Sequence, residues 1–232
     1  REGNRYRDFN IYTTNIEGYE NIIDRIFYEY NIPYYIDGKT TIKNSKLVQY
    51  ILKILNICIS DLNYQNVIDI LKLGLNDINI NELSILENYI LEFNLNKKSI
   101  DTTFKLNNDN SNDYIYDLDM LNDLNNRINE IFSFVKDFGK ANNVKQIVES
   151  VYNHLISENV FLNYDNLCEK IKEDTFNIYF EEQVWGRVVE VFTSINRIYT
   201  HNITIREFTS IFEVALSDIY IKSIPPSLDS VN

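Results

Sequence analysis

The amino-acid sequence predicts a mainly helical fold, a multi-helix bundle preceded by a short β-α-β segment. From Asn44 onward, apolar residues recur at three- and four-residue spacing, the period of amphipathic helices, almost to the end of the chain. The first ~40 residues instead place one helical pattern between two short runs with strand character. We therefore expect an α/β lead-in followed by an all-helical domain of about seven or eight helices.

The lead-in is expected to hold a strand at Phe9–Thr13, a helix at Gly18–Tyr30 and a second strand at Pro33–Ile36, closed by a turn at Asp37-Gly38. Such a unit crosses over with a right hand. Two strands and one helix need more sheet to pack against, because isolated strand pairs are marginal in water. We therefore interpret the chain, which begins with Arg1, as an internal fragment of a larger protein.

The helical part is expected to begin with a buried central helix, because the run from Leu47 to Ile59 is apolar nearly all round. Two later helices open with capping-box patterns, one from Asn143 to Gln146 and one from Thr204 to Glu207. An exposed Asn-rich loop is expected near residues 94–113. The remaining helices are expected over residues 64–73, 83–93, 118–138, 164–172 and 185–199.

The composition restricts the class of protein. A net charge of −12 argues against a free-standing DNA-binding domain, although a local basic strip remains compatible with it. Cys58 and Cys168 lie in apolar patterns and are expected to be reduced core thiols. No apolar run approaches the ~20 residues of a membrane span, and no signal peptide is visible, so we expect a cytoplasmic location without membrane contact.

A search for catalytic motifs finds none. The six glycines are scattered, so there is no phosphate-binding loop, and paired-His and CxxC motifs are missing. The histidines are far apart, and the acidic clusters of so acidic a chain are expected to be solvated helix faces. We therefore predict no catalytic residue, no metal site and no cofactor within the chain. The residues considered are His154, His201, Glu181, Glu182, Asp117, Asp119 and Asp123.

One basic strip stands out in this acidic chain. No acidic residue occurs between Gly38 and Ser60, whereas several lysines do. The functional hypothesis is an edge that contacts DNA phosphates at the end of the second strand. The alternative is a short basic loop beside a buried helix. Lys53 lies inside the apolar run and fits the hypothesis least, so the candidate DNA-binding residues are Lys39, Lys43 and Lys46.

The order of strand, helix, Ile-Pro-Tyr strand, turn and buried helix resembles the start of the second RecA-like domain of UvrD-type helicases. The matching residues are Tyr6–Asn15, at the strand of helicase motif IV, and Tyr28–Asp37. Three further patches resemble the AddB family, the B subunits of the bacterial ATP-dependent helicase/nuclease AddAB. They are Leu71–Leu75 with Leu86–Leu91, Gln183–Trp185 and Ile224–Val231.

The chain departs from active UvrD-type helicases at one position. Those enzymes usually carry an arginine just after the motif IV strand, where this chain has Thr13 or Thr14. A hydroxyl cannot supply the delocalised charge and paired donors of an arginine. The resemblance to AddB implies the same outcome, since the helicase-like half of that family is thought not to hydrolyse ATP.

By this resemblance, residues 1–57 belong to the second RecA-like domain, residues 58–223 form a helical insertion in it, and residues 224–232 return toward it. The chain would be an internal, non-catalytic segment of a protein that resects double-strand DNA breaks for recombinational repair. The resemblance further implies ATP with Mg²⁺ and a 4Fe-4S cluster in the parent, together with DNA and a heterodimeric partner, the AddA helicase/nuclease subunit.

Two alternatives stay open. One is a fragment of an ATP-hydrolysing UvrD-type DNA helicase, which an arginine at Thr13 or Thr14 would have favoured. The other is an acidic helical protein-interaction domain without a DNA role. The strand at Pro33–Tyr35 and the C-terminal Ile-Pro-Pro patch count against it, because a bare helical bundle needs neither.

Overall fold

The computed structural model describes residues 5–16, 18–36, 39–101, 103–105, 116–138, 140–170, 175–222 and 229–231. The described chain is mainly helical, as the sequence predicts. The α-helices are α1 (Glu20–Glu29), α2 (Lys46–Ile57), α3 (Tyr64–Leu71), α4 (Ile80–Glu92), α5 (Leu118–Ile131), α6 (Val135–Phe138), α7 (Val144–Ser157), α8 (Val160–Lys170), α9 (Thr175–Ile198) and α10 (Ile205–Ser217). The shorter elements are the 3-10 helices η1 (Tyr6–Asp8) and η2 (Ile42–Asn44) and the strands β1 (Lys39–Thr41) and β2 (Tyr220–Lys222).

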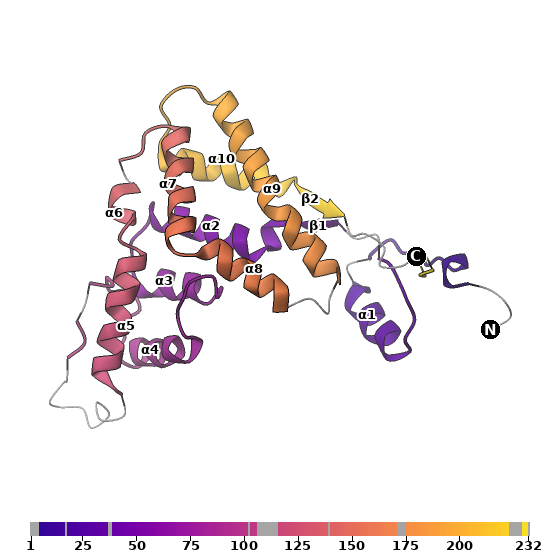
Figure 1. Cartoon of the computed structure of the whole chain (residues 1–232), viewed down its shortest axis with the longest axis horizontal. Helices are drawn as coiled ribbons and strands as arrows, with labels where there is room; N and C mark the ends of the chain where they lie inside the picture. The colour runs from indigo at the N-terminus through magenta and orange to yellow at the C-terminus, as the bar shows by residue number, and fades with distance from the viewer. Residues whose placement is uncertain are drawn as a thin grey trace.

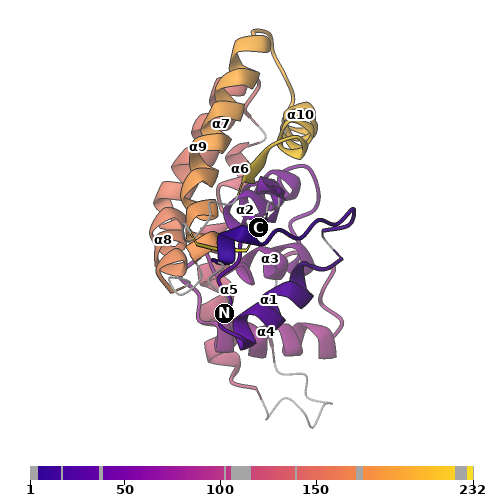
Figure 2. The ribbon, with the colours of Figure 1, turned by 90° about the vertical axis from the view of Figure 1, so that its right-hand side faces the viewer.

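The molecule has two parts, which we call the helical body (α2 to α10) and the N-terminal lobe (residues 5–36 with 229–231). Figure 1 shows the lobe, with η1 and α1, standing apart from the body. Figures 1 and 2 together show α7, α8 and α9 as one layer in front of α2, and these three helices contact one another. The paired strands β1 and β2 project from the body toward the lobe.

Helix α2 lies at the centre of the helical body, which confirms the buried helix that the sequence predicts. It contacts α3, α9 and α10. Seven of its twelve residues are buried, and its polar residues lie along the remaining side, where Lys46 and Asn56 are exposed. Truncating any one of its fully buried aliphatic side chains to alanine costs about 2–5 kcal/mol in comparable cores. These side chains are Leu47, Val48, Ile51, Ile54 and Leu55.

The predicted capping box is confirmed at α10 and in part at α7. The Thr204 hydroxyl accepts from the Glu207 amide, and the Glu207 carboxylate accepts from the Thr204 amide at 2.9 Å. At α7, Asn143 caps the Gln146 amide. The Gln146 side chain, however, accepts from the amide of Asn142 instead of closing the box on Asn143.

The expected helix over residues 118–138 is broken in the structure. Helix α5 ends at Ile131, and the short α6 begins at Val135. Phe132 is buried, and the centroid of the Phe134 ring lies 3.9 Å from the centroid of the His154 ring. Residues two apart point to opposite sides of an α-helix, so both rings reach the core only because the helix is interrupted between them.

The β-α-β unit is not confirmed. Helix α1 forms where expected, but residues 9–13 form no strand, because they have no partner strand within the described part of the chain. The second expected strand survives as one parallel bridge between Tyr34 and Val231. The Tyr35 amide donates to the Val231 carbonyl at 2.7 Å, and the Val231 amide donates to the Pro33 carbonyl at 2.9 Å. The Asp37-Gly38 turn lies outside the described residues.

Removing the cap of α10 is expected to destabilise the chain. We predict that Thr204→Ala lowers the free energy of unfolding by about 1 kcal/mol, because the Glu207 amide loses its side-chain acceptor. Urea denaturation followed by circular dichroism measures this change. Thr193→Ala is the matched control, since Thr193 lies inside α9 and only bonds back to the Val189 carbonyl. Equal losses in the two variants would contradict the prediction.

Candidate nucleic-acid interface

The basic strip begins in the two-stranded ribbon that joins the body to the lobe. Strands β1 and β2 pair antiparallel, with Lys39 opposite Lys222 and Thr40 opposite Ile221. The pairing continues where the Ile42 amide donates to the Ile219 carbonyl at 3.2 Å. The register therefore brings Lys222, from the far end of the chain, beside the first residue of the predicted strip.

The structure places the three predicted lysines on consecutive elements. Lys39 opens β1, Lys43 lies half-buried in η2, and Lys46 is the exposed first residue of α2. Sequence reasoning missed Lys222, because only the tertiary pairing of β1 with β2 reveals it. Lys53 is half-buried within α2, one turn beyond Gln49, and stays outside the strip. The strip thus follows one continuous stretch from the ribbon into the start of α2.

The N-terminus of α2 is already partly neutralised. Ser45 caps the helix by accepting from the Leu47 amide at 3.2 Å, and its hydroxyl donates to Glu181 Oε2 at 2.7 Å. The hydroxyl of Tyr164 also donates to this carboxylate, and burial followed by the Glu181 charge raises the pKa of Tyr164. Glu181 therefore places a negative charge beside the start of α2, where the positive end of the helix dipole favours it.

A phosphate could approach the start of α2 only from the side opposite Glu181. Glu181 reaches the helix start from α9, whereas Lys46 is exposed to solvent. Lysine binds phosphate as a mobile point charge without fixed geometry. The arrangement can therefore attract a nucleic-acid backbone, but it carries no means of reading a base sequence.

Comparison with known proteins gives the family context. The chain is 31% identical to the B subunit of the ATP-dependent helicase/deoxyribonuclease of Thermoanaerobacter sp. (strain X514), over 99% of its length. It is 32% identical to the corresponding protein of Clostridium botulinum (strain Hall) over 99% of its length, and 26% identical to that of Alkaliphilus oremlandii over the same share. The chain is homologous to a segment of AddB. It spans about a fifth of the length of these relatives (21% in each case).

No family model matches the chain. The homology to AddB agrees with the resemblance that the sequence motifs carry. The patches at residues 71–75, 86–91 and 183–185 lie in the helical body, whereas most of the patch at 224–231 falls outside the described residues.

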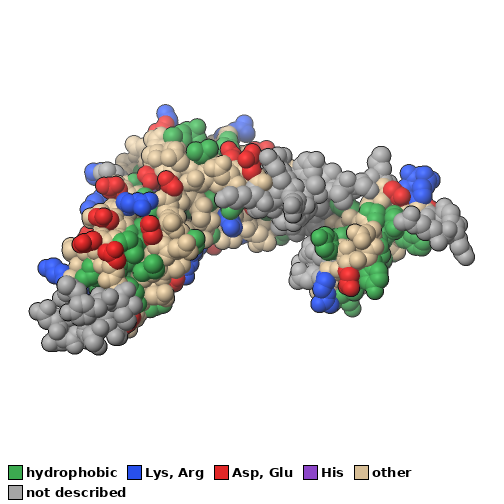
Figure 3. Space-filling view, turned by 60° about the horizontal axis from the view of Figure 1, so that its bottom comes forward, with side chains coloured by type: hydrophobic (Ala, Val, Ile, Leu, Met, Phe, Trp, Pro, Cys, Tyr) green, Lys and Arg blue, Asp and Glu red, His purple; other side chains and the backbone are tan. Residues whose placement is uncertain are grey.

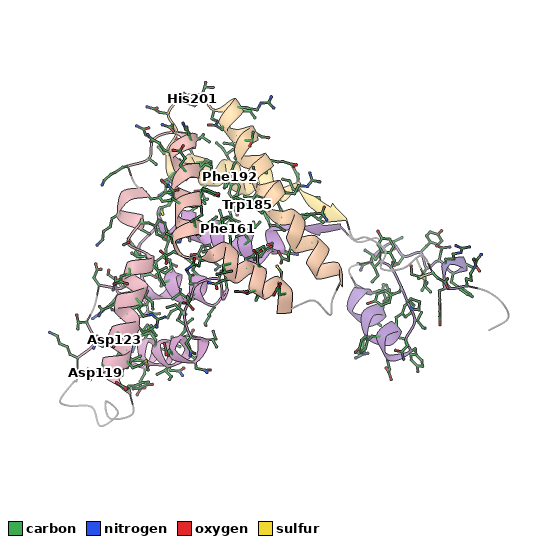
Figure 4. The ribbon with its side chains drawn as sticks, viewed as in Figure 1. Asp119, Asp123, Phe161, Trp185, Phe192 and His201 are labelled. Atoms are coloured by element: carbon green, nitrogen blue, oxygen red, sulfur yellow. The ribbon has the colours of Figure 1, made fainter. Side chains whose placement is uncertain are left out.

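The acidic residues of this AddB homologue do not gather into a metal site within the described residues. Asp117 caps α5 by accepting from the Met120 amide at 3.1 Å. Asp119 and Asp123 are exposed on α5, far from the centre of the body in Figure 4. Glu181 is held by Ser45 and Tyr164, and the side chain of Glu182 lies outside the described set. Asp119 and Asp123 are therefore solvated, and Asp117 serves as a cap.

The two histidines differ in environment. His201 is exposed near Tyr199. His154 is 4% exposed, and its Nε2 lies 2.9 Å from the Tyr50 hydroxyl, which also accepts from Asn76 Nδ2 at 3.0 Å. Because Asn76 donates to the Tyr50 oxygen, the Tyr50 proton is free to go to His154 Nε2. Burial lowers the pKa of His154 to about 4, so the ring is neutral at pH 7.

Both cysteines are free and half-buried, which agrees with the expected core thiols. Burial raises the pKa of Cys58 to about 12, and a thiol that stays protonated is a poor nucleophile. Within the described residues, no helix combines the length and the apolar character that crossing a membrane requires.

The buried His154 is expected to make folding sensitive to acid. Its folded pKa of about 4 lies below the unfolded value of 6.5, so the unfolded chain binds the proton more readily. Stability should therefore be complete above pH 6.5 and fall, by up to roughly 3 kcal/mol, as pH drops toward 4. Urea midpoints measured across this range test it. His154→Gln should flatten the slope and His201→Gln should not; equal slopes in both variants would refute the assignment.

Proposed function

We propose that the chain is an internal, non-catalytic segment of an AddB protein, part of an ATP-dependent helicase/deoxyribonuclease that acts in resection of double-strand DNA ends and recombinational repair. The observation that carries this proposal is the alignment of 99% of the chain with relatives of that family. The segment holds DNA and other parts of AddB in position. Helicase and nuclease chemistry belongs to the remaining four-fifths of the parent and to its AddA partner.

The domain boundaries form part of the proposal. Residues 1–57 contribute to a RecA-like domain, residues 58–223 form its helical insertion, and residues 224–232 return to it. The parallel bridge between Tyr34 and Val231 supports the return, because RecA-like sheets are built from parallel strands. Helix α2 packs with α3, α9 and α10, which favours moving the first boundary to the start of α2.

The exposed apolar surface of the lobe supports a larger sheet around it. Ile22 and Ile26 of α1 are 45% and 40% exposed, and Ile11 is 55% exposed. Figure 3 shows hydrophobic side chains gathered on the lobe, at the right of the view. A helix of a RecA-like domain buries such a face against the sheet, so the missing cover is the rest of that domain.

The proposed DNA contact is made by Lys39, Lys43 and Lys46 through phosphates. The positions of these residues support it, because the strip starts at the ribbon between the two parts and ends at Lys46, which is exposed. The net charge of −12 means that such contacts are local and weak when the chain acts alone.

Absence of ATP hydrolysis by the segment is proposed from its residues. Thr13 and Thr14 stand where active UvrD-type enzymes have an arginine, and the Thr13 hydroxyl accepts from the Asn15 amide. The rival function, an ATP-hydrolysing helicase fragment, needs a cation at that position. ATP with Mg²⁺ is bound elsewhere in the parent.

A 4Fe-4S cluster needs four thiolates, which the two cysteines of this chain do not supply. The parent acts in the cytoplasm.

The DNA proposal is tested by fluorescence anisotropy with a labelled single-stranded oligonucleotide. The chain should bind it with a dissociation constant well above micromolar at physiological salt, and more tightly at about 50 mM salt. At low salt, Lys43→Glu/Lys46→Glu should weaken binding roughly tenfold, because two phosphate contacts become repulsive. Lys97→Glu/Lys98→Glu, on the exposed turn after α4, makes the same charge change and should bind like the parent chain.

Two results would count against this proposal. Sub-micromolar affinity at physiological salt would contradict the weak, local contact. Equal weakening in both lysine pairs would mean that only net charge matters and that the strip is a basic loop beside a buried helix.

The purified chain is expected to show no ATPase activity, with or without single-stranded DNA, because it lacks a phosphate-binding loop. A phosphate-release assay measures the rate against a buffer blank. Turnover that persists in a second, independently purified sample would favour the ATP-hydrolysing helicase and sink the proposal.

A further inference from the structure

An exposed aromatic cluster lies where α7, α8 and α9, which we call the front layer, contact one another. Tyr152 of α7 stacks on Trp185 of α9, with ring centroids 6.2 Å apart, and Phe161 of α8 meets Trp185 edge-on at 4.8 Å. Figure 4 labels Phe161 and Trp185 where these helices meet. Tyr152 is 45% exposed, whereas the other two rings are half-buried. The cluster is therefore open to solvent on one side.

Aliphatic side chains extend this surface along two of the helices. Ile156 lies one turn after Tyr152 and is 50% exposed, and Val189 lies one turn after Trp185 and is 41% exposed. Residues four apart share a helix face, so both continue the same side. We call Tyr152, Ile156, Phe161, Trp185 and Val189 the aromatic patch. Contiguous apolar surface that includes Trp and Tyr is typical of binding sites and uncommon elsewhere.

The charges around the aromatic patch are predominantly negative. Glu149 precedes Tyr152 by one turn, and Asp165 and Glu169 follow Phe161 at successive turns of α8. Lys145 is the one ammonium among the described side chains on these faces. It lies 3.8 Å from Glu149, and both side chains are well exposed, so the pair is weak. The rim thus repels a nucleic-acid backbone and attracts a cation.

We propose that the aromatic patch docks a basic amphipathic helix of a partner protein. The partner's apolar side lies on Tyr152, Phe161 and Trp185, and its lysines or arginines meet Asp165 at the rim. Charge complementarity selects this occupant over DNA or an acidic segment. The inference does not depend on the DNA contact proposed for the lysine strip.

Trp185 is the only tryptophan of the chain, so its fluorescence reports directly on the patch. The probe is a synthetic helical peptide of leucine and lysine, with the leucines on one face. Titration into the full chain should shift Trp185 emission to shorter wavelength and saturate at one peptide per chain. The same peptide with glutamate in place of lysine should give at least tenfold weaker binding, and so should a scrambled leucine–lysine peptide.

Variants locate the site. Tyr152→Ser and Asp165→Lys should each weaken binding at least fivefold while the circular dichroism spectrum stays unchanged. Asp123→Lys, the same charge change on α5, is the matched control and should leave binding intact. Equal loss in the two charge variants would mean that the peptide follows net charge, which would overturn the proposal.

Other occupants give distinct outcomes, and each of them would also overturn the proposal. A blue shift with single-stranded DNA would assign the patch to nucleic acid. Emission that changes on dilution, together with a dimer mass by light scattering that Tyr152→Ser abolishes, would assign it to a second copy of the chain. If Trp185 emission does not respond to the leucine–lysine peptide, the patch does not bind a basic helix.

Discussion

The enclosure of α2 is the constraint on which the rest of the structure depends. Most of this helix is apolar, so α3, α9 and α10 must cover its buried residues before it is stable in water. Two buried polar groups, the capping residue Ser45 and Tyr50 within the helix, then fix the positions of α7, α8 and α9 along α2. Ser45 at its start binds Glu181 of α9 and Tyr164 of α8, and Tyr50 one turn on binds His154 of α7.

These polar contacts fix the register between α2 and the helices packed against it in an otherwise apolar core. A buried hydroxyl or imidazole without a partner costs about 1–3 kcal/mol, so packings that slide the front layer along α2 are disfavoured. The network around Tyr50 is not complete, because Asn76 Oδ1 is buried without a partner within the described residues. Hydrogen bonds therefore connect α7, α8 and α9 to the start of α2 at two residues, Ser45 and Tyr50.

Features set by local sequence were predictable, and features set by distant pairing were not. The apolar run of α2 and the Thr204 capping box are each contained in a few neighbouring residues. The pairing of β1 with β2 joins opposite ends of the chain and has no local signal, so Lys222 was missed. The break between α5 and α6 was also missed, since Ile128, Ile131, Val135 and Phe138 keep helical spacing across it and no local signal marks the interruption.

The candidate site shows the same division. The gap in acidic residues predicted a basic strip at the end of the second expected strand, and the structure places Lys43 in η2 and Lys46 at the start of α2. The sequence could not indicate that Glu181, from α9, accepts a hydrogen bond from Ser45, the cap of α2. The aromatic patch was equally hidden, because its three rings come from three helices and each fits the apolar pattern of its own helix.

The antiparallel pairing of β1 with β2 has an evolutionary consequence. The chain enters and leaves the helical body through two adjacent strands, so the body is attached at one place. A tight hairpin turn could replace everything between those strands without moving the residues before β1 or after β2. A body attached in this way can be enlarged, trimmed or exchanged by recombination between genes while the residues on either side of the two strands keep their positions.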